Sequence, residues 1–251
     1  KKKKIIFLST PYDEESVDML EKLKVKAYKI ASSDNSNIPL LKYVAKKKKP
    51  VLISTAMASI EEIKDVVKYI KKYIPNKFAL LQCTGNYPAK NSDSNLKVML
   101  KYKSFFNCMY GYSDHTQGYI NPIAATAMGA SVYEKHFTLD KNMQGPDHRM
   151  SLSIPELKKT IEIIRETTIA IGSGSKEILK SEKQNRLRLK KSLVSKKFIQ
   201  KGKRLNKNMF AVKRPVTGLL PKKIYTISNY VALKDIKPNL TIIKKMVKKI
   251  I

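Results

Sequence analysis

The three histidines of this 251-residue chain all fall between positions 115 and 148. His115 follows the hydrophobic run "CMYGYSD", and His136 lies 21 residues later in the next such run. This interval matches about one strand–helix unit, so the two imidazoles are expected at the ends of neighbouring parallel strands. Two imidazoles with oxygen ligands would form an open site for Mn²⁺ or Mg²⁺, which can polarise a carbonyl group. The alternative is a buried, hydrogen-bonded histidine at each position.

Hydroxyl groups and one lysine accompany the other hydrophobic runs. The hydroxyl side chains, which together with backbone N–H groups can bind phosphate, are those of Thr10, Ser32, Ser54, Thr55 and Ser113. Lys29 lies inside the apolar run "AYKIA", where a buried ammonium group requires a partner. An ion pair with Asp34 and an anionic ligand explain this lysine equally well. Asp147, in the loop "GPDHRM", either binds a polyol or shapes its own turn.

Short apolar runs recur before residue 172, and each ends in polar residues. They span residues 5–11, 27–34, 51–57, 79–88, 108–116 and 131–138. Amphipathic segments between them predict helices, and the clearest begins at Ser59, which forms a capping box with Glu62. Strands alternating with helices indicate a parallel α/β sheet, either doubly wound or closed into a (β/α)8 TIM barrel. The barrel is favoured because it would bring all the polar strand ends to one rim.

The chain is expected to hold only part of such a barrel, followed by a second domain. A closed barrel has eight strands, and because about six βα units are visible, the first two are expected to lie outside this sequence. Residues 1–172 are predicted to form the partial barrel, 173–191 a linker and 192–251 a small β-rich domain.

The predicted second domain contains a short internal repeat. Four residues recur 37 positions later: Ile199, Gly202, Leu205 and Met209 are matched by Ile236, Asn239, Ile242 and Met246. Glycine and asparagine both tolerate the left-handed backbone conformation, so the matched pair can occupy equivalent turns. The repeat predicts two similar hairpin-like halves.

The formal net charge of +31 raises the question of a nucleic-acid partner. The lysines are spread along the whole chain, and no RNA-binding or zinc-finger motif accompanies them, so no nucleic acid is expected. No apolar run reaches the length of about 18 residues that a membrane span requires, so no membrane partner is expected. Cys83 and Cys108 form no disulfide framework, and we interpret them as small core residues of a cytoplasmic protein.

Several motifs, in their order and spacing, resemble the N-acetylneuraminate (sialic acid) synthase family. They are "STP", "YKIASSDNSNIPLL", "PVLISTAM", "LLQCTGNYP", "GYSDHT", "GASVYEKHFTLD", "GPDH" and "VKRP". The resemblance implies a (β/α)8 barrel followed by an antifreeze-like (SAF) domain, with this chain beginning at the third barrel strand. It also implies condensation of phosphoenolpyruvate with N-acetylmannosamine or a related 2-acetamido sugar, which gives a nine-carbon 2-keto acid and phosphate. Legionaminate and pseudaminate synthesis by the same chemistry and an inactive homologue are the alternatives.

The resemblance also implies roles for individual residues. His115 and His136 would hold Mn²⁺ or Mg²⁺, and Tyr87 and Asp147 would face the sugar. The residues expected to bind phosphoenolpyruvate are Thr10, Lys29, Ser32, Ser54 and Ser113. Asp34 is expected to be catalytic, and it replaces a glutamate of many relatives with a shorter acid.

Three further implications concern the partner subunit and departures from the family pattern. Arg214 would reach into the barrel of the partner in a domain-swapped homodimer. Gly85 stands where relatives often carry a polar side chain. A family glutamate that positions the metal-bound water and a second lysine for phosphoenolpyruvate belong to barrel strands that align before Lys1.

Overall fold

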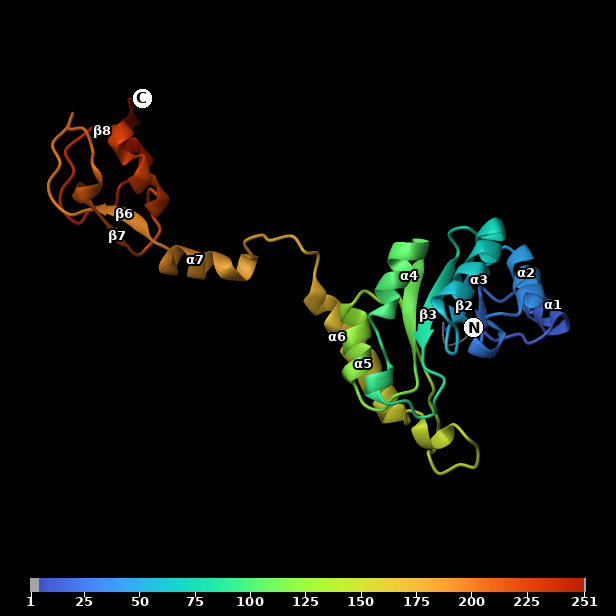
Figure 1. Ribbon diagram of the computed structural model, residues 1–251. Helices are drawn as coiled ribbons and strands as arrows, with labels where there is room; N and C mark the ends of the chain where they lie inside the picture. Colours follow the sequence, from blue (N-terminus) through green and yellow to red (C-terminus); the bar gives the residue numbers. More distant parts are fainter. Residues whose placement is uncertain (1–4, 251) are drawn as a thin grey trace. The chain divides into compact units, whose positions relative to one another are not determined.

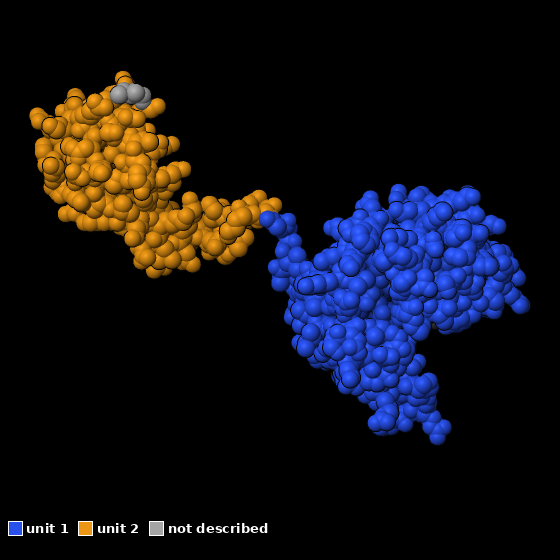
Figure 2. Space-filling model, in the orientation of Figure 1, with its two compact units in different colours: residues 1–174 blue, residues 175–251 orange. Residues whose placement is uncertain are grey.

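The computed structural model describes residues 5–250 and contains two compact units, Lys1–Gly174 and Ser175–Ile251 (Figure 2). Each unit has its own cluster of buried apolar side chains. None of the helices within residues 5–250 is long and apolar enough to cross a membrane.

The first unit contains a five-stranded parallel sheet with helices around it (Figure 1). Its strands are β1 (Tyr28–Ile30), β2 (Val51–Ser54), β3 (Phe78–Cys83), β4 (Met109–Asp114) and β5 (Val132–Lys135). The helices of this unit are α1 (Glu14–Lys22), α2 (Ile38–Lys46), α3 (Ile60–Tyr73), α4 (Val98–Phe106), α5 (Ile120–Ala127) and α6 (Ile154–Ile171). Each strand pairs with the next strand in the chain, whereas a doubly wound sheet reverses its strand order. The predicted barrel-type fold is confirmed.

One predicted strand is not formed. Residues 5–11 are irregular, and a single backbone hydrogen bond, from Lys29 N–H to the Ser9 carbonyl at 3.3 Å, joins them to β1. Ile5, Ile6 and Phe7 are mostly exposed, so this apolar run lacks the packing that stabilises a strand. The described residues therefore form an open five-stranded sheet, with β1 and β5 at its edges.

Helix α3 illustrates how local sequence positions the sheet. Ser59 and Glu62 form the predicted capping box, in which each side chain accepts a hydrogen bond from the backbone of the other residue. Ile63, Val67 and Ile70 lie on one face of the helix and are buried. This apolar face joins the core formed with the strands.

The pairing of β4 with β5 matters most for the site. Gly111 is paired with Val132, Ser113 with Glu134, and the next residues of the two strands pair in the same register. The strands approach closely at Gly111, because a Cβ atom there would lie 2.1 Å from the Val132 carbonyl oxygen. This register brings the segments that carry the two histidines side by side.

The second unit is a small β domain. The segment predicted as a linker contains a helix, α7 (Lys183–Leu189). Strand β6 (Ser192–Ser195) pairs antiparallel with β7 (Phe210–Lys213), and β8 (Tyr230–Ala232) pairs antiparallel with β9 (Val247–Lys249).

The repeat detected in the sequence corresponds to these two halves. Its six apolar positions are buried, and Gly202 and Asn239 have positive φ angles of 78° and 59°. An isolated bridge between Ile199 and Ile236 connects the two copies at their first matched position.

Candidate active site

A cavity of about 510 Å³ lies where the carboxyl ends of the strands meet. All five residues expected to bind phosphoenolpyruvate line it: Thr10, Lys29, Ser32, Ser54 and Ser113. The same cavity is lined by His115 and His136, which are expected to hold the metal, and by Tyr87, which is expected to face the sugar. Because the strands converge, residues more than 100 positions apart in the sequence lie in one cavity.

The two histidines approach each other in this cavity, with ring centroids 5.3 Å apart. His115 Nδ1 lies 2.7 Å from the Thr84 carbonyl oxygen. A carbonyl oxygen can only accept, so Nδ1 carries the proton and Nε2 keeps its lone pair. Burial lowers the pKa of His115, which favours the neutral imidazole. A neutral ring held by a backbone carbonyl is the usual state of a metal-binding histidine.

Tyr87 covers the pair of imidazoles. Its ring centroid lies 4.0 Å from that of His115 in a tilted stack and 5.9 Å from that of His136 at a right angle. Burial raises the pKa of Tyr87, so its hydroxyl group stays protonated. The side chain remains about half exposed and therefore stands at the mouth of the cavity.

The spacing of the imidazoles suits a shared divalent ion. Ring centroids 5.3 Å apart are close enough for one nitrogen of each imidazole to reach a common ion, because metal–nitrogen bonds are about 2.1 Å long. Within residues 5–250 no group of three histidine, cysteine or acidic side chains gathers as ligands. A divalent ion held by the two imidazoles would therefore need oxygen ligands at its other coordination positions. Such an arrangement fits the Mn²⁺ or Mg²⁺ that the sequence predicts.

The cavity lining also contains an ammonium group, that of Lys29. Lys29 Nζ donates to Ser54 Oγ at 2.7 Å and to the Ile30 carbonyl at 2.9 Å. Its ion-pair partner is Glu134, with 3.6 Å between Nζ and Oε2. Burial lowers the pKa of Lys29, and the negative charge of Glu134 opposes this shift. An ammonium group presented beside several hydroxyls can bind the phosphate or carboxylate of a ligand.

Of the two explanations for Lys29, the ion pair with Asp34 is wrong, because the partner is Glu134. Asp34 instead accepts hydrogen bonds from Ser33 Oγ and Asn37 Nδ2 in its own turn, at 3.0 and 3.1 Å. Glu134, the actual partner, was missed by the sequence interpretation. Its position two residues before His136 in one apolar run was the available signal, because alternate residues of an extended run face the same side of a sheet.

Three predicted site residues do not line the cavity. Asp34 lies in the turn that follows β1. Asp147 stands beside the site, with its Oδ2 3.8 Å from His136 Nδ1. Arg214 belongs to the second unit, where its side chain is exposed.

Comparison with known proteins places this geometry in a family. The model of the NeuB family matches residues 1–176, and that of the SAF domain matches residues 190–248. The chain belongs to the NeuB family. This confirms the predicted resemblance to sialic acid synthases and the predicted SAF domain after the barrel. It also confirms that the chain belongs to a family of synthase enzymes.

Named relatives of this NeuB-family chain are sugar-acid synthases. It is 44% identical to the N,N′-diacetyllegionaminic acid synthase of Campylobacter jejuni, over 94% of this chain and 72% of that protein. It is 36% identical to the N-acetylneuraminate-9-phosphate synthase of Homo sapiens, over 97% of this chain and 68% of that protein.

Solved structures support the same assignment. The N-acetylneuraminic acid synthetase of Leptospira borgpetersenii is 37% identical with a TM-score of 0.69, over 73% of this chain and 64% of that one. A spore coat polysaccharide biosynthesis protein of Chromobacterium violaceum has a TM-score of 0.85 over 98% of this chain and 75% of that one. At 23% identity, this second likeness supports the fold alone.

One departure from the NeuB-family pattern has a structural counterpart. Gly85 lines the cavity, and a Cβ atom there would lie 3.3 Å from Met57 Cγ. Met57 has a positive φ of 62° and is largely exposed at the cavity rim. A flexible thioether side chain therefore lies beside the position at which the family resemblance led us to expect a polar side chain.

Proposed function

We propose that the protein condenses phosphoenolpyruvate with a 2-acetamido hexose to form a nine-carbon 2-keto sugar acid. The observation that carries this proposal is one cavity whose lining combines an ammonium group, several hydroxyls and two neighbouring imidazoles. Such a cavity can hold an anionic enol ester against an aldehyde. N-acetylmannosamine and diacetamido hexoses are the acceptors that follow from the names of the sialic acid and diacetyllegionaminic acid synthases.

Lys29 and the hydroxyl groups that line the cavity with it would bind phosphoenolpyruvate. The Lys29 ammonium group, oriented by Ser54, would contact its phosphate or carboxylate. Hydroxyl groups of the same cavity would complete this anion site, namely those of Thr10, Ser32 and Ser113. Preorganised donors of this kind stabilise charge that develops in a transition state, and removing one typically costs about 3–4 kcal/mol.

The two imidazoles and the residues beside them would bind the acceptor sugar. His115 and His136 would hold Mn²⁺ or Mg²⁺, and the bound ion would supply Lewis-acid polarisation of the aldehyde oxygen. Tyr87, over both rings, and Asp147, beside His136, would orient the sugar. Asp34 lies in the turn after β1 and does not line the cavity, so its proposed contact with the reacting region requires that turn to move inward. Its side chain is one methylene shorter than glutamate.

The proposed reaction forms one carbon–carbon bond and breaks one carbon–oxygen bond. C3 of phosphoenolpyruvate attacks the aldehyde carbon of the open-chain sugar, and the aldehyde oxygen gains a proton. Water adds to the cationic C2 and loses a proton. The resulting tetrahedral carbon expels inorganic phosphate and becomes the 2-keto group, so no oxidant or reductant is required.

The proposal includes a domain-swapped homodimer. Arg214 is exposed in the second unit and would contribute its guanidinium group to the cavity of the partner subunit. An arginine suits this role because it can bind carboxylate or hydroxyl oxygens with a rigid pair of donors.

Phosphate release tests the proposed function. We expect the protein, expressed at its natural length, to release phosphate from phosphoenolpyruvate only with a 2-acetamido hexose and Mn²⁺ or Mg²⁺ present. His115→Ala and His136→Ala should each abolish release, whereas His148→Ala should retain it. His148 is the matched control because its Nδ1 contacts Thr138 Oγ1 at 2.7 Å, outside the cavity lining. Release that persists in both cavity variants would contradict the metal assignment, and a panel of acceptors would identify the sugar.

A further inference from the structure

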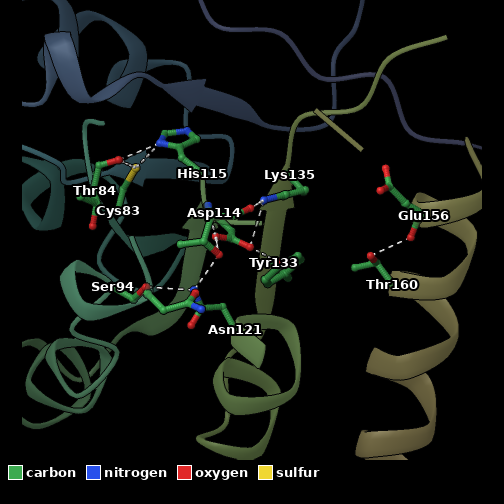
Figure 3. A network of polar contacts seen from close by, with 12 residues as sticks. Cys83, Thr84, Ser94, Asp114, His115, Asn121, Tyr133, Lys135, Glu156 and Thr160 are labelled. Atoms are coloured by element: carbon green, nitrogen blue, oxygen red, sulfur yellow. Dashed lines mark hydrogen bonds and ion pairs between the residues drawn. The ribbon is translucent and has the colours of Figure 1, made fainter. Parts of the chain in front are cut away.

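A buried polar cluster immediately precedes the two imidazoles in the sequence (Figure 3). Asp114 and Lys135 are paired residues of β4 and β5, and each is followed directly by one of the histidines. Their side chains are 0% and 4% exposed, and 3.2 Å separates Lys135 Nζ from Asp114 Oδ2. Part of Lys135 lines the cavity, but its ammonium group donates to Asp114 and to the Thr116 carbonyl.

The Asp114 carboxylate is fully engaged. Tyr133 donates its hydroxyl hydrogen to Oδ2, the same oxygen that Lys135 contacts. Thr116 donates to Oδ1 from both its backbone N–H and its hydroxyl group, each at 2.7 Å. Asn121 then donates to the Thr116 hydroxyl at 2.7 Å and extends the network to α5. The residues on both sides of His115 are therefore fixed by one carboxylate.

We propose that the Asp114–Lys135–Tyr133 cluster is a positioning device that sets the distance between the His115 and His136 imidazoles, an inference that rests on the proposed metal site. A slip of one residue between two strands turns each side chain to the opposite face of the sheet. Such a slip would also leave a buried carboxylate and a buried ammonium group without partners, which is strongly unfavourable. The ion pair thus holds the register in which both rings face one cavity.

A purely structural role would affect stability without changing metal affinity. The chain contains a matched control, because Asp18 accepts hydrogen bonds from the Tyr43 hydroxyl at 2.9 Å and from Lys47 at 2.6 Å. This Tyr–Asp–Lys group joins α1 to α2 and lies outside the cavity lining. It offers the same chemistry without neighbouring histidines.

The experiment compares two double variants by Mn²⁺ titration, with free Mn²⁺ measured by electron paramagnetic resonance. Asp114→Asn with Lys135→Met removes both buried charges, and Asp18→Asn with Lys47→Met removes both charges of the more exposed control group. We expect the first variant to bind Mn²⁺ about 10–100-fold more weakly, the usual effect of losing groups that orient metal ligands. Its affinity for inorganic phosphate, measured by calorimetry, should stay within about twofold of the wild type because Lys29 is untouched. The control variant should match the wild type in both measurements.

The outcomes separate this inference from the proposed function. Wild-type protein that fails to bind Mn²⁺ would overturn the metal site itself. If the wild type binds Mn²⁺ and the folded Asp114→Asn, Lys135→Met variant binds it with the same affinity, only the positioning role is overturned. If that variant does not fold, Tyr133→Phe decides, because it removes only the hydroxyl group that contacts Asp114. The proposal requires a several-fold weaker Mn²⁺ affinity there, and unchanged affinity would contradict it.

Discussion

At the scale of single residues, the carboxylate of Glu134 is the unexpected feature of the anion site. It lies 3.6 Å from Lys29 Nζ and also accepts from Ser54 Oγ at 3.4 Å. A ligand phosphate would need the same ammonium and hydroxyl groups. Glu134 therefore acts as the internal counter-ion of Lys29 and competes with an incoming anion.

Removing this charge should strengthen anion binding. We expect Glu134→Gln to bind inorganic phosphate about five- to tenfold more tightly, because like-charge repulsion over a few ångströms is lost. Calorimetric titration at constant ionic strength measures the change. Glu156→Gln is the control, since Glu156 is also paired with a lysine, Lys141, at 2.6 Å but lies outside the cavity lining. Equal or weaker phosphate binding by Glu134→Gln would contradict the counter-ion role.

His115 should make stability depend on pH. Burial lowers its pKa, so the unfolded chain binds a proton here more readily than the folded chain. The stability contributed by the neutral ring is present above the unfolded pKa of about 6.5 and is lost as pH falls toward the lower folded value. We expect the unfolding free energy of metal-free wild type to fall more steeply between about pH 7 and pH 5 than that of His115→Gln. Urea unfolding at a series of pH values tests this, and parallel curves would refute it.

At the scale of elements, the close approach of β4 and β5 at Gly111 can be perturbed directly. A Cβ atom there would meet the Val132 carbonyl oxygen at 2.1 Å and Leu81 Cδ2 at 2.9 Å, so Gly111→Ala must push the strands apart. We expect a loss of about 1–3 kcal/mol in unfolding free energy, the usual result of overpacking, together with weaker Mn²⁺ binding. Denaturant unfolding and metal titration measure the two effects.

A loop glycine provides the comparison. Gly118 has a positive φ of 82°, but a Cβ atom added there would have no neighbouring side chain or backbone within 4 Å, so its alanine variant meets no steric conflict. Gly118→Ala should lose stability modestly through backbone strain and keep its Mn²⁺ affinity. A Gly111→Ala protein with normal metal affinity would show that the strand spacing does not control the imidazoles.

The sequence was sufficient to predict most elements and the convergence of the site. Apolar runs and the capping box at Ser59 depend on neighbouring residues, and barrel geometry then brings polar strand ends together. Residues 5–11 were mispredicted because an apolar run is stable as a strand only when its side chains are packed, and Ile5, Ile6 and Phe7 are mostly exposed. The Asp114–Lys135 pair depends on register between strands, which periodicity along one chain does not encode. The Lys29–Glu134 pair joins β1 to β5, which are not hydrogen-bonded neighbours, so it depends on the curvature of the whole sheet.

At the scale of the whole molecule, the proposed exchange of domains can be tested by mixing two inactive variants. His115→Ala inactivates the cavity, and Arg214→Ala removes the guanidinium group of the second unit. In a swapped heterodimer, one cavity combines intact His115 with intact Arg214 from the partner chain. Random reassortment should then restore about a quarter of the wild-type phosphate release.

One outcome of the mixing experiment would contradict the exchange of domains. If Arg214 served the cavity of its own chain, every site in a mixed dimer would lack one of the two residues, and no activity would return. Each variant assayed alone provides the baseline, and mixing after mild dissociation and reassociation provides the heterodimers.

The position of Tyr87 over both imidazoles also makes the cavity optically accessible. The chain has thirteen tyrosines and no tryptophan, so Tyr87→Trp would introduce its sole indole at the cavity mouth. Emission excited at the red edge of the spectrum would come from that ring alone. Paramagnetic Mn²⁺ entering between the histidines would quench it, whereas Mg²⁺ would leave it bright, and ligand occupancy could be followed in real time.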